Sequence, residues 1–281
     1  MPNLNLLLEP FSYEFMRNAV AAGIWAAIIC PVIGSYLIVQ RMALLGDVIA
    51  HAVLPGLVLA AFFQFDLLIG AIASGILAAL IITLLRNQTK VKIDAAMALI
   101  FSSFFGTGIL LISLLKIKVD LDALLFGDIL TVKSTDVWRT GWICVGILAI
   151  VRLFYKELLF YTFDPLGAEA LGLPINLLYF GLITAITLTI VASMQTMGVI
   201  LIIALLVGPA LTAYMWVKEL WQMMLLGIAI AVVTVIIGMY LSYYLNLPSG
   251  AVIVVISFLK FLVSLAWHNL TSRVPKNPRK F

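Results

Sequence analysis

Asp47 and His51 stand four residues apart in a segment, residues 44–56, that is otherwise apolar. On an α-helix, residues four apart lie on the same face, so the carboxylate and the imidazole point in one direction. An ionisable side chain is costly to place inside a membrane, which makes it a candidate for function. Carboxylate oxygen and imidazole nitrogen are ligands for divalent transition metals. The pair therefore predicts a metal site within a membrane.

The depth of this pair follows from Arg41, which marks the end of the preceding apolar segment. At about 1.5 Å per residue, Asp47 lies roughly 9 Å and His51 roughly 15 Å from that boundary, close to the midplane of a bilayer. Two side chains do not complete a metal shell, but two copies of the chain around a twofold axis would supply four ligands. A hydrogen bond between helices is the alternative role for the pair.

The composition indicates a polytopic integral membrane protein. Of the 281 residues, 64% are hydrophobic and 11% are charged, and the mean hydropathy is +1.19. Apolar runs long enough to cross about 30 Å of hydrocarbon recur along the chain. We therefore expect an all-α fold of about nine transmembrane helices in a single domain, residues 1–281. The expected spans are 17–39, 44–64, 66–86, 95–115, 135–155, 176–194, 197–217, 222–245 and 250–268.

The distribution of Lys and Arg predicts the orientation. Alternate connections carry eleven basic residues on one side, the four of the tail included, and five on the other. The richer side is expected to be cytoplasmic, which puts the N-terminal segment 1–16 outside and the basic tail 269–281 inside. We interpret this tail as an anchor to anionic lipid and not as a nucleic-acid patch. Cys30 and Cys144 lie in apolar segments and are expected to be buried thiols without a disulfide.

Proline and glycine are expected to interrupt three of the spans: Pro31 the first, Pro55-Gly56 the second and Gly208-Pro209 the seventh. Proline removes the hydrogen bond to the carbonyl four residues earlier, which for Pro55 is the carbonyl of His51. Broken helices at membrane depth are tolerated where they line a cavity or are covered by protein. The alternative is that these residues are simply common in membrane helices.

Two connections between the expected spans are predicted to contain short helices. Residues 119–132 are apolar but too short to span, and we expect a re-entrant or surface helix there. Within residues 156–175, Asp164-Pro165 is typical of a helix start, and Gly172 with Pro174 is typical of a helix end. This pattern predicts a short capped helix over Leu166–Leu171 on the cytoplasmic side. An ordinary solvated connection is the alternative.

Motifs of soluble catalytic sites are missing from the sequence. It contains no GxxxxGK[ST], so the chain is not expected to hydrolyse ATP itself, and no HExxH or GxSxG of proteases and esterases. We expect a transport subunit and not an enzyme.

The run from Gln40 to Gly56 resembles the second-segment signature of the manganese/zinc ABC permeases, R-x-x-L-x-G-D-x-x-x-H-x-x-x-P-G. Residues 163–174 resemble the coupling loop of that family, and residues 196–213 resemble a later family segment. The resemblance covers essentially the whole chain.

This resemblance implies a fold related to the permeases of cobalamin and siderophore importers. It implies a homodimer in a bacterial cell membrane, a separate cytoplasmic ATPase dimer and an extracytoplasmic metal-binding protein. Asp47 and His51 would form the metal site on the pathway, and no cofactor would be permanently bound. The transported metal would be Mn²⁺, with Zn²⁺ or Fe²⁺ as alternatives. The residues that would couple to the ATPase are Asp164, Pro165, Leu166, Ala168, Glu169, Leu171 and Gly172.

Two other functions remain open at this point. A stand-alone channel or secondary carrier would need neither the ATPase nor the docking loop. An intramembrane metalloenzyme would need a general base beside a metal-bound water, and no second inward-facing acid or base is evident in the sequence.

Overall fold

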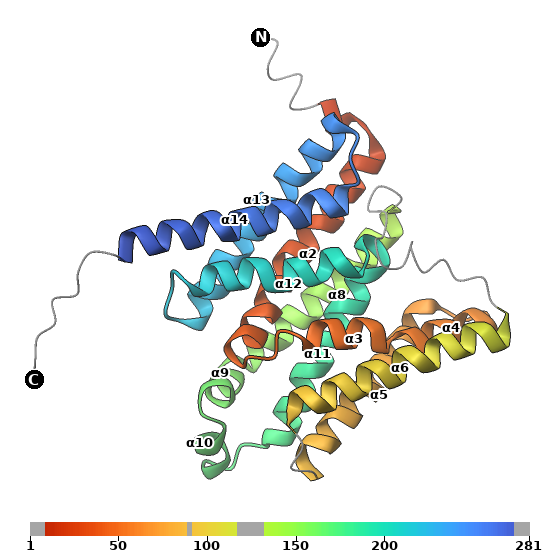
Figure 1. The fold of residues 1–281 in the computed structure, drawn as a ribbon, viewed down its shortest axis with the longest axis vertical. Helices are drawn as coiled ribbons and strands as arrows, with labels where there is room; N and C mark the ends of the chain where they lie inside the picture. Colours follow the sequence, from red (N-terminus) through yellow and green to blue (C-terminus); the bar gives the residue numbers. More distant parts are fainter. Residues whose placement is uncertain (1–8, 89–91, 117–131, 273–281) are drawn as a thin grey trace, which may run out of the picture.

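The computed structural model describes residues 9–88, 92–116 and 132–272, and every regular element in them is helical. Figure 1 shows the helices with their labels. The first half of the chain forms η1 (Glu9–Ser12), α2 (Glu14–Val39), α3 (Leu45–Ala52), α4 (Leu54–Phe63), α5 (Leu67–Gln88) and α6 (Ile93–Leu115). The second half forms α8 (Ser134–Leu153), α9 (Tyr155–Phe163), α10 (Pro165–Ala170), α11 (Ile175–Met197), α12 (Val199–Tyr214), α13 (Leu220–Leu245) and α14 (Ser249–Ser272).

The expected all-α membrane fold is confirmed. In the described part of the chain, seven spans are long and apolar enough to cross a membrane: α2, α3 with α4, α5, α6, α11, α13 and α14. The other two expected spans coincide with α8 and α12. Helix α12 is apolar but has 16 residues, and the 20 residues of α8 include three charges, Asp136, Arg139 and Arg152.

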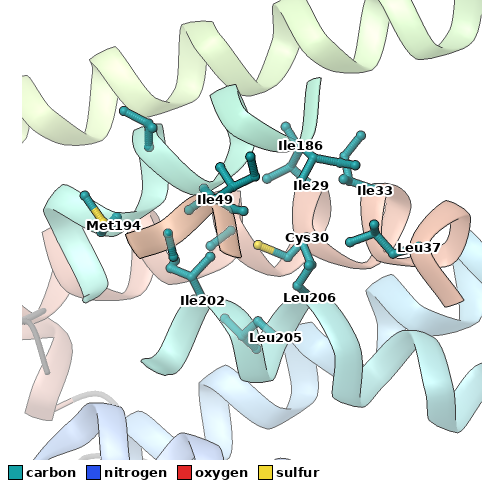
Figure 2. Close-up of a cluster of buried hydrophobic side chains, with 14 of the residues drawn as sticks. Ile29, Cys30, Ile33, Leu37, Ile49, Ile186, Met194, Ile202, Leu205 and Leu206 are labelled. Atoms are coloured by element: carbon teal, nitrogen blue, oxygen red, sulfur yellow. The ribbon is translucent and has the colours of Figure 1, made fainter. Parts of the chain in front are cut away.

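The core is built around α2, which packs against α12 and α13. Side chains of α2, α3, α11 and α12 meet in one buried cluster (Figure 2). Ile49 of α3 lies in that cluster and is fully buried. Both cysteines are buried free thiols, as expected. Burial of Ile49 anchors one face of the short helix that carries Asp47 and His51.

Helix α2 ends in a tight turn that sends the chain back into α3. The N–H of Met42 bonds to the Leu37 carbonyl at 2.8 Å, and the N–H of Arg41 bonds to the Ile38 carbonyl at 3.1 Å. This is the hydrogen-bond pattern of a Schellman cap, with Arg41 in the left-handed conformation at φ 58°. After this turn, α3 packs against α6 and α11.

The interruptions expected at Pro31 and at Gly208-Pro209 are wrong as helix ends. Helix α2 continues through Pro31, and α12 continues through Pro209. One proline removes a single hydrogen bond, and neighbouring helices can cover the loss. Gly227 of α13 packs against both: a Cβ there would lie 3.0 Å from Pro31 Cβ and 3.7 Å from the Pro209 carbonyl oxygen. The second span does divide, at Val53, and Pro55 stands in the first turn of α4.

The expected short helix after the fifth span is confirmed as α10, one residue earlier than expected. The Asp164 carboxylate accepts the N–H of Gly167 at 2.9 Å and caps its start. Gly172, at φ +78°, follows its end, and the N–H of Leu173 bonds to the Ala168 carbonyl at 3.0 Å. The surface or re-entrant helix expected over 119–132 falls almost entirely outside the described residues, as does most of the tail 269–281.

Candidate metal site

Helix α3 presents Asp47 and His51 on the side opposite its buried face. Leu45 and Ile49 are fully buried, whereas the side chain of Asp47 is 46% exposed and that of His51 is 18% exposed. Gly46 lets α3 approach α12, since a Cβ at this position would lie 2.9 Å from Leu206 Cδ2. The apolar residues and the glycine around the pair therefore hold it at an open edge of the helix bundle.

The hydrogen bonds of His51 select one ring nitrogen for a ligand. Its Nδ1 lies 2.9 Å from the backbone carbonyl oxygen of Asp47 and 3.4 Å from Asp47 Oδ1. A carbonyl oxygen only accepts, so Nδ1 must carry the proton and donate it. The lone pair of the neutral ring is then on Nε2. A backbone carbonyl on one nitrogen is the usual arrangement that orients a metal-binding histidine.

Two phenylalanines of α6 enclose the imidazole. The ring centroids of Phe101 and Phe105 lie 5.0 and 5.4 Å from that of His51, both edge-on. These rings restrict the orientation of His51 and exclude water from its sides. The sequence analysis did not identify them. Phe101 and Phe105 are four residues apart on one helix, as Asp47 and His51 are. No pattern in the sequence, however, predicts that α6 packs against α3.

A groove of about 530 Å³ opens beside Asp47, between α3, α12 and α14. Gly208 lines it together with residues of α14 such as Ser257 and Phe258. Pro55 and Gly56 lie elsewhere, at a smaller groove of about 380 Å³ between α4, α5 and α6. Of the three predicted helix breaks, the one at Gly208-Pro209 thus borders the groove beside Asp47, whereas Pro55-Gly56 lies in the first turn of α4, the helix that follows α3.

Within the described ranges, one protomer brings together no more than two candidate metal ligands, Asp47 and His51. No group of three or more His, Cys, Asp or Glu side chains gathers anywhere in them. The second histidine, His268, lies on α14 against Trp216, with ring centroids 5.6 Å apart. A metal held by Asp47 and His51 would need ligands from outside this chain, because transition metals take four or more.

The residues expected to couple to an ATPase lie on and around α10, which projects at one end of the molecule together with α9 (Figure 1). Leu166 and Leu171 are 78% and 73% exposed, and Glu169 is exposed as well. Ala168 is fully buried, and Asp164 and Gly172 form the two ends of the helix. The coupling set and the metal pair are therefore on different elements and do not touch.

Comparisons with known proteins agree on the class of this chain. The ABC 3 transport family matches residues 12–268. The manganese transport system membrane protein MntC of Listeria monocytogenes is 41% identical over 90% of both chains. The chelated iron transport system membrane protein YfeD of Yersinia pestis is 38% identical over 95% of this chain and 90% of its own length.

Two solved structures share the fold. PsaBC from Streptococcus pneumoniae, solved in complex with Fab, matches with a TM-score of 0.83 and 37% identity over 93% of this chain and 95% of that one. An inward-facing metal-chelate type ABC transporter matches with a TM-score of 0.70 over 95% and 91% of the chains, and at 17% identity it supports the fold alone. With a family match over most of its length and relatives near 40% identity, this chain is a membrane permease of the ABC 3 transport family.

Proposed function

We propose that this chain is the membrane subunit of an ATP-driven importer for a divalent transition metal, with Mn²⁺ as its cargo. The observation that carries the proposal is the Asp47–His51 pair: a carboxylate and an imidazole on one face of a membrane helix, with Nδ1 of His51 already engaged and Nε2 left for a metal. Relatives named for manganese transport favour this cargo.

Two copies of the chain would complete the site. Asp47 and the neighbouring Leu44 are exposed on the isolated protomer, Leu44 by 67%. The helices on either side, α6 and α14, are the least buried of the apolar spans. A twofold axis near α3 would cover these faces and bring two carboxylates and two imidazoles together. Mixed oxygen and nitrogen ligands of this kind suit Mn²⁺, Fe²⁺ and Zn²⁺.

Ferrous iron is the second candidate cargo, because relatives of similar identity are named for iron transport. Zinc would bind the same four ligands more tightly than manganese according to the Irving–Williams order. Choice of metal would then depend on site geometry or on delivery by an extracytoplasmic metal-binding protein.

ATP hydrolysis would belong to a separate cytoplasmic dimer, since the sequence has no phosphate-binding loop of its own. We propose α10 as the element that docks on it, through the exposed Leu166, Glu169 and Leu171. This assignment puts α10 and the C-terminus on the cytoplasmic side of a bacterial plasma membrane and the N-terminus outside, as the Lys and Arg distribution predicts. A stand-alone channel would not require such an element.

The test is metal uptake by cells that express single variants at equal levels in the membrane. Asp47→Ala and His51→Ala should each reduce Mn²⁺ uptake at least about tenfold, because each removes half of the ligands. Asp94→Ala and His268→Ala are matched controls that alter an exposed carboxylate and the other histidine. Uptake near the unmodified level in both site variants would refute the proposal, and competition by Fe²⁺ or Zn²⁺ would identify the preferred cargo.

A further inference from the structure

Arg86 joins three helices at the end of α5. Its guanidinium donates a hydrogen bond to the Tyr161 hydroxyl of α9 at 2.8 Å. It also lies over the ring of Tyr179 of α11, with Cζ 4.0 Å from the centroid. Both tyrosines are buried, at 2% and 1% exposure. A planar cation that stacks on one aromatic ring and bonds to another hydroxyl fixes the relative position of all three helices.

The two tyrosines belong to the helices that flank α10. Helix α9 ends at Phe163, with only Asp164 between it and α10, and α11 starts at Ile175, shortly after α10 ends. Helix α10 also packs against both neighbours. A displacement of α10 must therefore move the Tyr161–Tyr179 pair, and with it the end of α5.

The other part of α5 contacts the division between α3 and α4. The Ser74 hydroxyl donates to the Ala52 carbonyl at 2.7 Å, and Ala52 directly follows His51. Gly75 faces Val53, the residue at the division: a Cβ there would lie 3.3 Å from Val53 Cγ1. Twelve residues separate Ser74 from Arg86, or about 18 Å of continuous helix.

We propose that Arg86 is a positioning residue that links α10 to the metal-binding helix, with α5 as the rigid connection. A shift of α10 would move Arg86, and α5 would transmit the shift through Ser74 to the carbonyl beside His51. Because the helix is divided at Val53, α3 could move without a matching movement of α4. The proposal rests on the proposed function, in which α10 meets the ATP-hydrolysing partner, and it requires that both ends of α5 bias the same movement.

The experiment uses the complete transporter, with its ATPase and metal-binding partners, in liposomes. Metal moved per ATP hydrolysed is measured for Tyr161→Phe and Ser74→Ala, each of which removes one hydroxyl from the connection. Each should lower this ratio roughly three- to tenfold, the factor that one hydrogen bond is worth. Equilibrium binding of Mn²⁺ should stay unchanged, and the thermal midpoint of the complex should fall by no more than about a few degrees. The ratio in the double variant should be no lower than in the more severely affected single variant, because both changes interrupt the same connection.

Two hydroxyl deletions serve as matched controls. Thr83 lies on the same helix, but its hydroxyl bonds to Ala79 within α5. The buried Tyr36 hydroxyl has no hydrogen-bond partner among the described residues. Thr83→Ala and Tyr36→Phe should keep the full ratio. An unchanged ratio in Tyr161→Phe, an equal loss in the controls, or additive losses in the double variant would each overturn the connection. If the unmodified complex did not bind Mn²⁺ at all, the proposed metal site would be refuted instead.

Discussion

His51 is held in an orientation that would suit the metal binding proposed for it. Its Nδ1 is held 2.9 Å from the Asp47 carbonyl, and Phe101 and Phe105 enclose the ring. A ring fixed in this way loses little rotational freedom on binding, so less of the binding energy is spent on ordering it. The same contact puts Asp47 Oδ1 only 3.4 Å from Nδ1, on the side of the ring away from Nε2. A bound metal would therefore draw the carboxylate toward it.

Protons should compete with the metal for this pair. Coordination requires a neutral imidazole and an ionised carboxylate, so binding releases any proton that occupies either group. Mn²⁺ affinity should therefore fall as the pH drops from about 8 to about 5.5, across the range in which histidine ordinarily titrates. Calorimetry in buffers of different ionisation enthalpy would count the protons released. Affinity that stays constant over this range would contradict a role for His51 as a ligand.

Helix α10 is stabilised by the residues that cap its two ends. A six-residue helix is too short to be stable alone. The Asp164 carboxylate satisfies one free N–H at its start, and Gly172 allows the left-handed turn that closes its end. Burial of Ala168 attaches it to the protein, while Leu166 and Leu171 remain exposed. These contacts would let α10 transmit a displacement from the ATPase proposed to dock on it.

Disturbing α10 should uncouple ATP hydrolysis from transport. Glu169→Arg reverses a charge on the proposed docking surface, and insertion of Gly-Ser after Gly172 loosens the junction with α11. Each should lower the metal moved per ATP at least about threefold while hydrolysis continues, since a flexible junction transmits little displacement. Glu14→Arg, the same charge reversal at the exposed start of α2, is the control. Normal coupling in both α10 variants would make this segment an ordinary connection.

The described part of one protomer would not complete the proposed metal site by itself. Among the described residues, two candidate ligands lie beside an open groove, and the apolar helices α6 and α14 remain largely exposed on either side. A second copy would provide the missing ligands and cover these faces. The pathway for the metal would then run between two copies and not through one bundle.

A linked dimer would separate a shared site from two independent ones. When His51→Ala is placed in one half only, a shared site loses a quarter of its ligands, and affinity for Mn²⁺ should fall at least about tenfold. The intact half would not compensate, because its described residues bring together only Asp47 and His51 at the site. Calorimetry on the linked, unmodified dimer should give one metal per dimer. Two metals per dimer, with one site unaffected by the change in the neighbour, would exclude the shared site.

Local chemistry determined the outline of this protein. Mean hydropathy and segment length identified the membrane helices, Asp164 and Gly172 identified α10, and the spacing of Asp47 and His51 put both on one face of α3. These features depend on neighbours along the chain, so a window of residues contains the information. The family signature from residue 40 to 56 added the class of transporter, which the comparisons confirm.

Packing between helices determined the rest. The contacts of His51 with Phe101, of Ser74 with Ala52, and of Arg86 with Tyr161 join residues on different helices. Membrane helices are apolar on nearly every side. A stripe of hydrophobic residues therefore does not indicate which face of a helix packs against which neighbour. The same packing carried α2 and α12 through Pro31 and Pro209, where backbone rules alone predicted an end. Which helices contact each other depends on the close packing of small and branched side chains, and this packing forms only when the bundle assembles.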